Sequence, residues 1–291
     1  MELRVLQYFL AVTREQSISG AAETLHLSQP TLSRQLKEME EELGKQLMIR
    51  GNRRITLTEE GMILRKRAEE IMELVQKAKN EISLSDEIIA GDITIGAGET
   101  NGVRFLVKAA KTLQETYPLI HLHIISGDKA RVTEELDRGL IDFGLIFGDV
   151  DTSKYEYLKL PYKDTWGVIM RKDAPLAQKE TILAEDLLDK PLIISRQAFQ
   201  NKEFRDFFPY DQEKLNIVAT YNLLFNGSLM VDEGMGYAIS FEKLLNFTGD
   251  SNLCFRPLEP TLEAGMHIIW KKYQILTKAT DRFLQKLKKI I

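Results

Sequence analysis

The residues best suited to chemistry lie near the start of the chain, where a polar stretch opens a helix. Ser28 is a good N-cap, because its hydroxyl can accept from an amide of the next turn, and Pro30 is tolerated in a first turn. At 100° per residue the helix has an apolar face, formed by Leu32, Leu36, Met39 and Leu43. Its outer face carries Pro30, Arg34, Lys37 and Glu41, flanked by Thr31 and Ser33. An ordinary solvated helix has the same pattern, but hydroxyls and cations near a helix N-terminus can also reach phosphates and base edges in a DNA major groove.

The segments before this helix favour the second interpretation. Apolar residues at helical spacing predict a helix over 3–13, and Ser17 or Ser19 can cap a second, short helix that ends near Leu25. A three-residue connection, 27–29, then leads to the helix described above. This order predicts a helix-turn-helix, in which the second helix of the pair enters the groove.

A basic hairpin is predicted after the helix that Ser28 caps, which we call the reading helix. Gly44 is a good helix stop, and apolar and polar residues alternate over 47–57, as in a two-stranded wing. The whole chain has a net charge of −4 and a pI of about 5.8, so positive charge for DNA must be local. Between residues 45 and 56 there are cations and no acidic residue. A solvated hairpin tip is the alternative, but beside a reading helix we expect contacts with phosphates or the minor groove from Arg50, Arg53 and Arg54.

A long helix is predicted over 59–90, capped by Thr58. Its apolar residues recur at intervals of three and four, as in a heptad seam: Leu64, Ala68, Ile71, Val75, Ala78 and Ile82. Charged residues cover its other faces, which favours a two-stranded coiled coil over a helix packed on its own domain. We therefore expect a homodimer that presents two reading helices to one DNA duplex.

Beyond Gly91 the pattern changes to alternating strands and helices, which indicates an α/β fold. Strands are predicted at 92–96, 121–125, 143–146, 166–170, 192–194, 216–218, 236–239, 253–255 and 266–270, and helices at 103–117, 129–138, 228–233 and 280–289. About 200 residues of this kind exceed one small open sheet, which predicts two lobes with a cleft between them.

The sequence gives no catalytic or metal-binding set. Cys254 is the only cysteine and lies in an apolar segment, so neither an internal disulfide nor a zinc site is expected, and Ser195 and Ser240 lack the surroundings of a nucleophile elbow. The glycines at 96–102 miss the dinucleotide fingerprint by one residue, so we expect no cofactor. An apolar run of the ~20 residues that span a bilayer is absent, as is a signal peptide, so a cytoplasmic protein is expected and no membrane partner.

The N-terminal sequence resembles the winged helix-turn-helix of LysR-type transcriptional regulators. The resemblance rests on FLAV at 9–12, SISGAAETLHLSQPTLSRQL at 17–36, EELG at 41–44, Arg50, and LT at 57–58. It places Gln29, Pro30, Ser33 and Arg34 where the family reads bases and grips phosphates. With Ser28, Thr31, Lys37 and the three wing arginines they form the predicted DNA-binding set. The predicted domains are a DNA-binding domain at 1–58, a dimerisation helix at 59–90 and an effector-binding domain at 91–291.

The C-terminal sequence resembles the effector-binding domain of the same family, which is related in fold to periplasmic solute-binding proteins. The resemblance rests on residues 96–98, 117–118, 139–142, 173–177 and 232–237. It implies a first lobe at about 92–161 and 267–291, and a second at about 162–266.

Candidate effector contacts follow from this arrangement, because ligands of open α/β sheets bind beyond the carboxyl ends of the strands. The first lobe offers Gly98, Glu99, Thr100, Asn101 and Phe147. The second offers Asn222 and the places where the family holds its effector, namely Ser195, Arg196, Gln197 and Phe199. Glu99 disfavours an anion and Arg196 favours one, so a ligand of either sign fits these residues.

The predicted function is therefore a non-enzymatic transcriptional regulator whose DNA binding and bending respond to a small molecule in the cleft. The expected partners are a double-stranded DNA operator, the effector, a second copy of the chain in a homodimer or a dimer of dimers, and RNA polymerase. The alternative is a solute-binding protein without a transcriptional role, which fits the C-terminal half but leaves the N-terminal helices unexplained.

Overall fold

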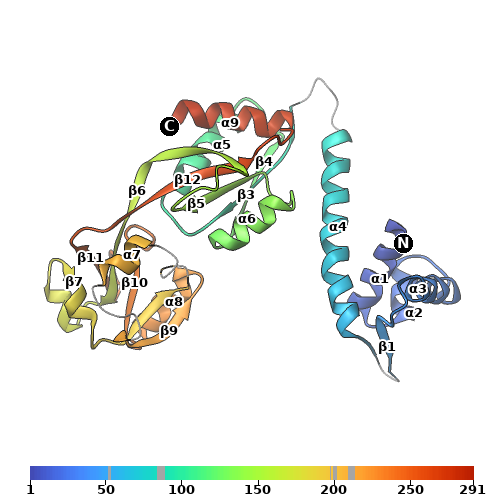
Figure 1. Cartoon of the computed structure of the whole chain (residues 1–291), viewed down its shortest axis with the longest axis horizontal. Helices are drawn as coiled ribbons and strands as arrows, with labels where there is room; N and C mark the ends of the chain where they lie inside the picture. Colours follow the sequence, from blue (N-terminus) through green and yellow to red (C-terminus); the bar gives the residue numbers. More distant parts are fainter. Residues whose placement is uncertain (52–53, 84–88, 197, 199–201, 209–213) are drawn as a thin grey trace. The chain divides into compact units, whose positions relative to one another are not determined.

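The chain forms two compact units, Met1–Ser85 and Asp86–Ile291 (Figure 1). The structure is a computed structural model that describes residues 1–291 except 52–53, 84–88, 197, 199–201 and 209–213. No helix within these described ranges is both long and apolar enough to cross a membrane. Each unit is described by itself below.

The first unit is a winged helix-turn-helix followed by a long helix, as the sequence predicts. Its elements are α1 (Leu3–Glu15), α2 (Ile18–Thr24), α3 (Gln29–Leu43), β1 (Met48–Arg50), β2 (Ile55–Leu57) and α4 (Glu59–Ser83). Ser17 caps α2, because its Oγ accepts from the Gly20 amide at 3.2 Å. Gly44 ends α3 with a φ of 63°, a left-handed conformation that a side chain disfavours.

The core of this unit joins the three short helices to the wing. Phe9, Val12, Leu32 and Leu36 are fully buried in one cluster, to which the wing contributes Leu47 and Met48. The Glu40 carboxylate of α3 accepts from the amides of those two wing residues, at 2.7 and 3.1 Å. One expectation is wrong: Leu43 is 41% exposed, because α3 ends at the next residue and its last turn is not covered.

The long helix α4 belongs to the same core. Gly61 lies so close to the wing that a Cβ there would come within 2.0 Å of the Leu47 carbonyl oxygen. Leu64 packs against the cluster, and Ala68 is fully buried within the single chain, where α4 contacts α1. The prediction that Leu64 and Ala68 belong to the dimerisation seam is therefore wrong, because both face their own domain.

The first lobe of the second unit is a sheet with helices on both faces. It contains β3 (Gly91–Ala97), α5 (Val103–Gln114), β4 (Ile120–Ser126), α6 (Lys129–Asp137), β5 (Phe143–Phe147), β12 (Glu263–Lys271) and α9 (Lys278–Ile290). The strand order is β4-β3-β5-β12, with β3 parallel to both of its neighbours. Helices α5 and α9 pack side by side over a core that includes Ile95, Phe143 and Phe283 (Figure 1). On the other face, Val132 of α6 packs in a cluster with Ile269 of β12.

The second lobe repeats this plan. It contains β6 (Tyr155–Arg171), β7 (Ile182–Leu183), β8 (Leu192–Ser195), α7 (Lys202–Phe207), β9 (Ile217–Tyr221), α8 (Leu224–Asp232), β10 (Tyr237–Phe241) and β11 (Leu253–Glu259), with short 3₁₀ turns at Pro175–Gln178 and Ala184–Leu187. β10, β8 and β9 run parallel, and α8 contacts all three. The fold class predicted from the sequence is confirmed.

Two long strands cross from one lobe to the other. β6 has 17 residues and pairs antiparallel with β12 over its first part, then with β10 and β11 over its second. The sequence predicts only 166–170 of it, because polar residues and Pro161 interrupt the apolar pattern earlier in the strand. The predicted lobe boundaries, 161/162 and 266/267, fall inside β6 and β12, so the lobes share continuous strands.

Candidate functional site

The predicted DNA-binding face of α3 is exposed in the first unit. Gln29, Pro30, Arg34 and Lys37 are exposed, and Ser33 is half-buried. Ser28 caps the helix as predicted: its Oγ accepts from the Thr31 amide at 3.3 Å and lies 2.7 Å from the Thr31 hydroxyl. These two hydroxyls stabilise the first turn of the helix. The exposed side chains of Gln29, Arg34 and Lys37 can then face a groove.

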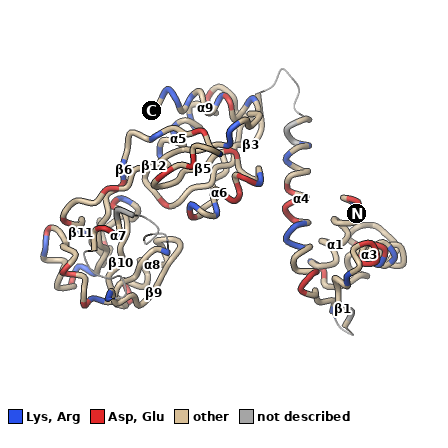
Figure 2. Tube along the Cα trace, viewed as in Figure 1, with Lys and Arg blue, Asp and Glu red and all other residues tan. Residues whose placement is uncertain are grey.

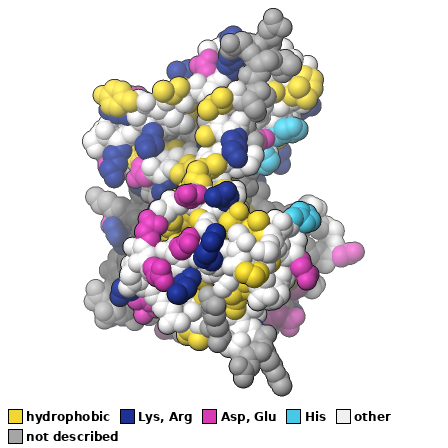
Figure 3. Space-filling view, turned by 90° about the vertical axis from the view of Figure 1, so that its right-hand side faces the viewer, with side chains coloured by type: hydrophobic (Ala, Val, Ile, Leu, Met, Phe, Trp, Pro, Cys, Tyr) yellow, Lys and Arg dark blue, Asp and Glu magenta, His cyan; other side chains and the backbone are white. Residues whose placement is uncertain are grey.

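The two cations of α3 form exposed ion pairs along the helix. Arg34 Nε lies 3.7 Å from a Glu38 carboxylate oxygen, and Lys37 Nζ lies 3.3 Å from one of Glu41. Exposed pairs of this kind contribute only about 0.3–0.5 kcal/mol, so a phosphate or a base can replace them at small cost. In α3 the two cations precede four glutamates, whereas acidic and basic stretches alternate along α4 (Figure 2). Cations and carboxylates are interspersed on the face shown in Figure 3.

The wing is described in part. Its strands pair with Arg50 opposite Ile55, and the Ile55 amide donates to the Gln16 carbonyl oxygen at 2.8 Å, which ties the wing to the end of α1. Arg54 is exposed at the tip. Arg53 and the side chain of Arg50 lie outside the described residues.

A cavity of about 240 Å³ lies between the two lobes of the second unit. Its walls come from the carboxyl ends of parallel strands: β3, β4 and β5 in the first lobe, and β8, β9 and β10 in the second. This is where an open α/β sheet places a ligand. The principal side chains in its lining are Glu99, Lys129, Phe147, Asp149, Trp166, Ser195, Tyr221, Asn222, Leu224, Ser240 and Phe241.

Five of the predicted effector contacts line this cavity: Gly98, Glu99, Phe147, Ser195 and Asn222. Three described ones do not, namely Thr100, Asn101 and Arg196, the last of which is exposed to solvent. Gln197 and Phe199 lie outside the described residues.

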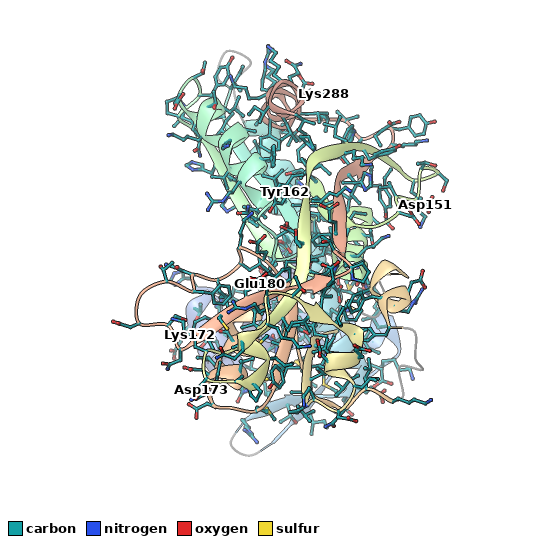
Figure 4. The ribbon with its side chains drawn as sticks, turned by 90° about the vertical axis from the view of Figure 1, so that its left-hand side faces the viewer. Asp151, Tyr162, Lys172, Asp173, Glu180 and Lys288 are labelled. Carbon is teal, nitrogen blue, oxygen red and sulfur yellow. The ribbon has the colours of Figure 1, made fainter. Side chains whose placement is uncertain are left out.

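Thr100, predicted as an effector contact, does not line the cavity because its hydroxyl is engaged elsewhere. Its hydroxyl donates to the carboxylate of Asp164 on β6 and accepts from the Gly102 amide at 2.9 Å, so the hydroxyl is already engaged both as donor and as acceptor. Next to it, the Asn101 side-chain amide donates to the hydroxyl of Tyr162 at 3.2 Å, and Figure 4 shows Tyr162 on the crossing strand. Both residues therefore fix the loop after β3 to the crossing strand.

Asp164 is fully buried at this crossing, and burial raises its pKa, against the effect of hydrogen bonds from Thr100 and Tyr162. A carboxyl whose pKa is raised holds more protons in the folded than in the unfolded state, so the free energy of unfolding falls as the pH rises through the raised value. Asp164→Asn removes this titration. We expect the variant to lose less stability than the parent as the pH rises above about 4, the ordinary pKa of an aspartate.

Thermal unfolding over a series of pH values from about 4 upward measures this effect, with the exposed Asp250→Asn as the matched control. Equal pH dependence in the parent and Asp164→Asn would show that the buried carboxyl does not titrate in this range.

Apart from Phe147, the aromatic wall of the cavity was not predicted. Phe241 lies between Trp166 and Phe147, with ring centroids 4.1 and 4.9 Å away. Trp166 is 4% exposed, and its Nε1 is buried without a hydrogen-bond partner among the described residues. Position after a strand could have indicated Phe241, but Trp166 lies inside a crossing strand, and only the fold brings it to the cavity.

The described residues outside the cavity offer neither a reactive cysteine nor a metal site. Cys254 is buried in β11, and burial raises the pKa of its thiol, which disfavours the nucleophilic thiolate. Among the residues the structure describes, no group of three or more His, Cys, Asp or Glu side chains could hold a metal ion.

Comparison with known families accounts for nearly the whole chain. Residues 3–62 match the family model "Bacterial regulatory helix-turn-helix protein, lysR family", and residues 87–290 match "LysR substrate binding domain". The HTH-type transcriptional regulator BsdA of Bacillus subtilis (strain 168) is 33% identical over 198 residues, which cover 67% of each chain. The Hca operon transcriptional activator HcaR of Escherichia coli (strain K12) is 27% identical over 287 residues, 97% of this chain and 95% of that protein.

Solved structures agree on the fold. Full-length CbnR complexed with its target DNA has a TM-score of 0.79 to this chain at 18% identity, and the match covers 100% of both chains. Regulators of this family are not enzymes, which confirms the prediction of a non-enzymatic protein and removes the alternative of a solute-binding protein without a transcriptional role. The chain belongs to the LysR family and is a DNA-binding transcriptional regulator with an effector-binding domain.

Proposed function

We propose that α3 reads the major groove of a DNA operator and that the wing grips the adjacent backbone. The observation that carries this proposal is the exposed face of Gln29, Pro30, Arg34 and Lys37, held in place by the Ser28 cap. CbnR, which shares the fold, was solved with its target DNA, which supports the same role for this chain. Ser33 and Arg54 complete the proposed contacts, together with Arg50 and Arg53.

The binding of a small molecule in the cavity of the second unit is proposed to control this contact. β6 and β12 run through both lobes, so a ligand that draws the lobes together bends shared strands. Such a ligand shifts the equilibrium only as far as its affinities for the two arrangements differ. The proposed output is a change in operator bending.

Assembly is proposed to use the outer part of α4. Ile71 and Val75 are half-buried, and Ala78 and Ile82 are exposed, so an apolar stripe is available to a second copy. A homodimer, or a dimer of dimers, then presents reading helices to both halves of a palindromic operator. We further infer that the regulator acts in the cytoplasm and contacts RNA polymerase at its promoters.

The proposed function is tested by salt-dependent binding and footprinting of the full-length protein on the DNA upstream of its own coding region, with and without small molecules. A salt-sensitive footprint that one compound changes supports both the reader and the sensor. Equal affinity for this DNA and for unrelated DNA at every salt concentration would contradict specific reading.

Arg34→Ala should weaken operator binding by ~1–3 kcal/mol, which is about 5- to 150-fold, because a side chain that reaches a base or phosphate is lost. A titration at moderate salt measures the change. Arg282→Ala, which removes an exposed arginine from α9 in the other unit, is the control and should bind as the parent does. Unchanged affinity in Arg34→Ala would remove this residue from the proposed interface.

A further inference from the structure

The described lining of the effector cavity contains one charged side chain away from the rim. Among the described lining residues, the charged ones are Glu99, Lys129 and Asp149. Lys129 and Asp149 are exposed, and Lys129 Nζ donates to the backbone oxygen of Asp149 at 2.5 Å. Glu99 is half-buried, so its carboxylate dominates the charge that a ligand inside the cavity meets.

The Glu99 carboxylate is held in place from the opposite lobe. It accepts a hydrogen bond from the amide of Leu224, the first residue of α8. The N-cap of that helix, Leu223, has no side chain that can accept, so Glu99 caps the helix across the cavity. A free amide and the helix dipole both stabilise a negative charge at this point.

This arrangement disfavours an anionic ligand. The helix N-terminus that could bind a ligand carboxylate already holds that of Glu99, and two carboxylates in one cavity repel each other. No arginine is among the described residues of the lining, and Arg196, directly after β8, lies outside it and is exposed. A cation, in contrast, can pair with the second oxygen of Glu99 while the first stays on the Leu224 amide.

The size and the walls of the cavity indicate the shape and polarity of the uncharged part of the ligand. Phe147, Trp166 and Phe241 form a continuous aromatic wall, which suits an apolar body and also attracts a nearby cation through the ring faces. A cavity of roughly 150 Å³ is known to hold benzene, so about 240 Å³ has room for one ring with a short arm.

We propose that the effector is a small organic cation, with an ammonium group on a short arm and an apolar, ring-sized body, and that Glu99 is the residue that selects its charge. The inference rests on the proposed role of this cavity as the effector site. Glu99 binds the ammonium group, the aromatic wall holds the body, and the cap on α8 keeps the carboxylate in position.

Three probes of nearly equal shape test the charge preference on the full-length protein by isothermal titration calorimetry. They are 2-phenylethylamine, which is cationic, 2-phenylethanol, which is neutral, and phenylacetate, which is anionic. We expect the amine to bind at least about tenfold more tightly than either of the others, the size of one charge-assisted hydrogen bond. Phenylacetate that binds as tightly as the amine, or no binding by the amine, would overturn the inference.

The variant Glu99→Gln tests whether the charge of Glu99 is responsible for the preference. The amide oxygen of the substituted side chain can still accept from the Leu224 amide, so the cap is kept while the charge is lost, and thermal unfolding of the ligand-free variant checks that the fold is intact. We expect the variant to lose about tenfold in amine affinity and to bind the alcohol as the parent does. Asp250→Asn, which neutralises an exposed carboxylate of the second lobe outside the cavity lining, is the matched control and should keep the preference for the amine.

Operator binding by the ligand-free protein separates this inference from the proposed function. A specific footprint together with a preference for the anion overturns the charge assignment alone. A preference for the amine without any operator footprint supports the charge assignment and contradicts the proposed reading of DNA.

Discussion

Replacing both Ile71 and Val75 by glutamate is expected to convert the assembled protein to monomers and to weaken operator binding by about 10²–10⁴-fold. Both side chains are half-buried in the single chain, on the part of α4 that follows Leu64 and the buried Ala68. Four carboxylates along one seam repel across a dimer, and a lone reader loses the gain from linking two binding events. The change leaves α3 itself untouched.

Light scattering measures the mass, and an operator titration measures the affinity. Glu73→Gln with Lys79→Gln, two exposed positions on the same helix, is the control and should stay assembled. An unaltered mass for the glutamate variant would show that this stripe is not the interface.

Phe283→Ala is expected to lower the free energy of unfolding of the second unit by ~3–5 kcal/mol, the usual cost of truncating a buried phenylalanine. Phe283 of α9 is fully buried, and its ring centroid lies 5.4 Å from that of Phe143 on β5. The truncation leaves a cavity between helix and sheet in the lobe that holds Glu99.

Urea unfolding followed by circular dichroism measures the change, because the transition midpoint moves with stability while its slope is kept. Phe225→Ala, at a side chain that is 64% exposed, should change stability by no more than about 0.5 kcal/mol. Equal losses in the two variants would mean that burial in the first lobe does not determine the stability of this unit.

The reader could be predicted from sequence because its signals are local. Ser17 and Ser28 cap the helices that directly follow them, and Gly44 ends the helix that precedes it. Helix starts and stops of this kind depend on neighbours within one turn of the chain. The same reasoning fails at Leu43, where periodicity gives the direction of a side chain but not whether anything covers it.

The cavity could be predicted only in outline. Glu99 follows a strand and Ser195 ends one, and strand ends are visible as breaks in an apolar run. The hydrogen bond between Glu99 and Leu224 joins residues 125 positions apart, and that of Thr100 to Asp164 joins residues 64 apart. Such contacts depend on how β6 crosses the lobes, which no local pattern specifies.

The close approach of Gly61 to the wing also determines where this protein can be divided. Because Gly61, Leu64 and Ala68 complete the core of the reader, a chimera joined at residue 58 would pair one protein's core with another's helix. A junction beyond Ser83 keeps the reader and α4 together. The exchangeable part of this regulator is therefore the reader with its long helix, and a sensor from another family member is best joined after that helix.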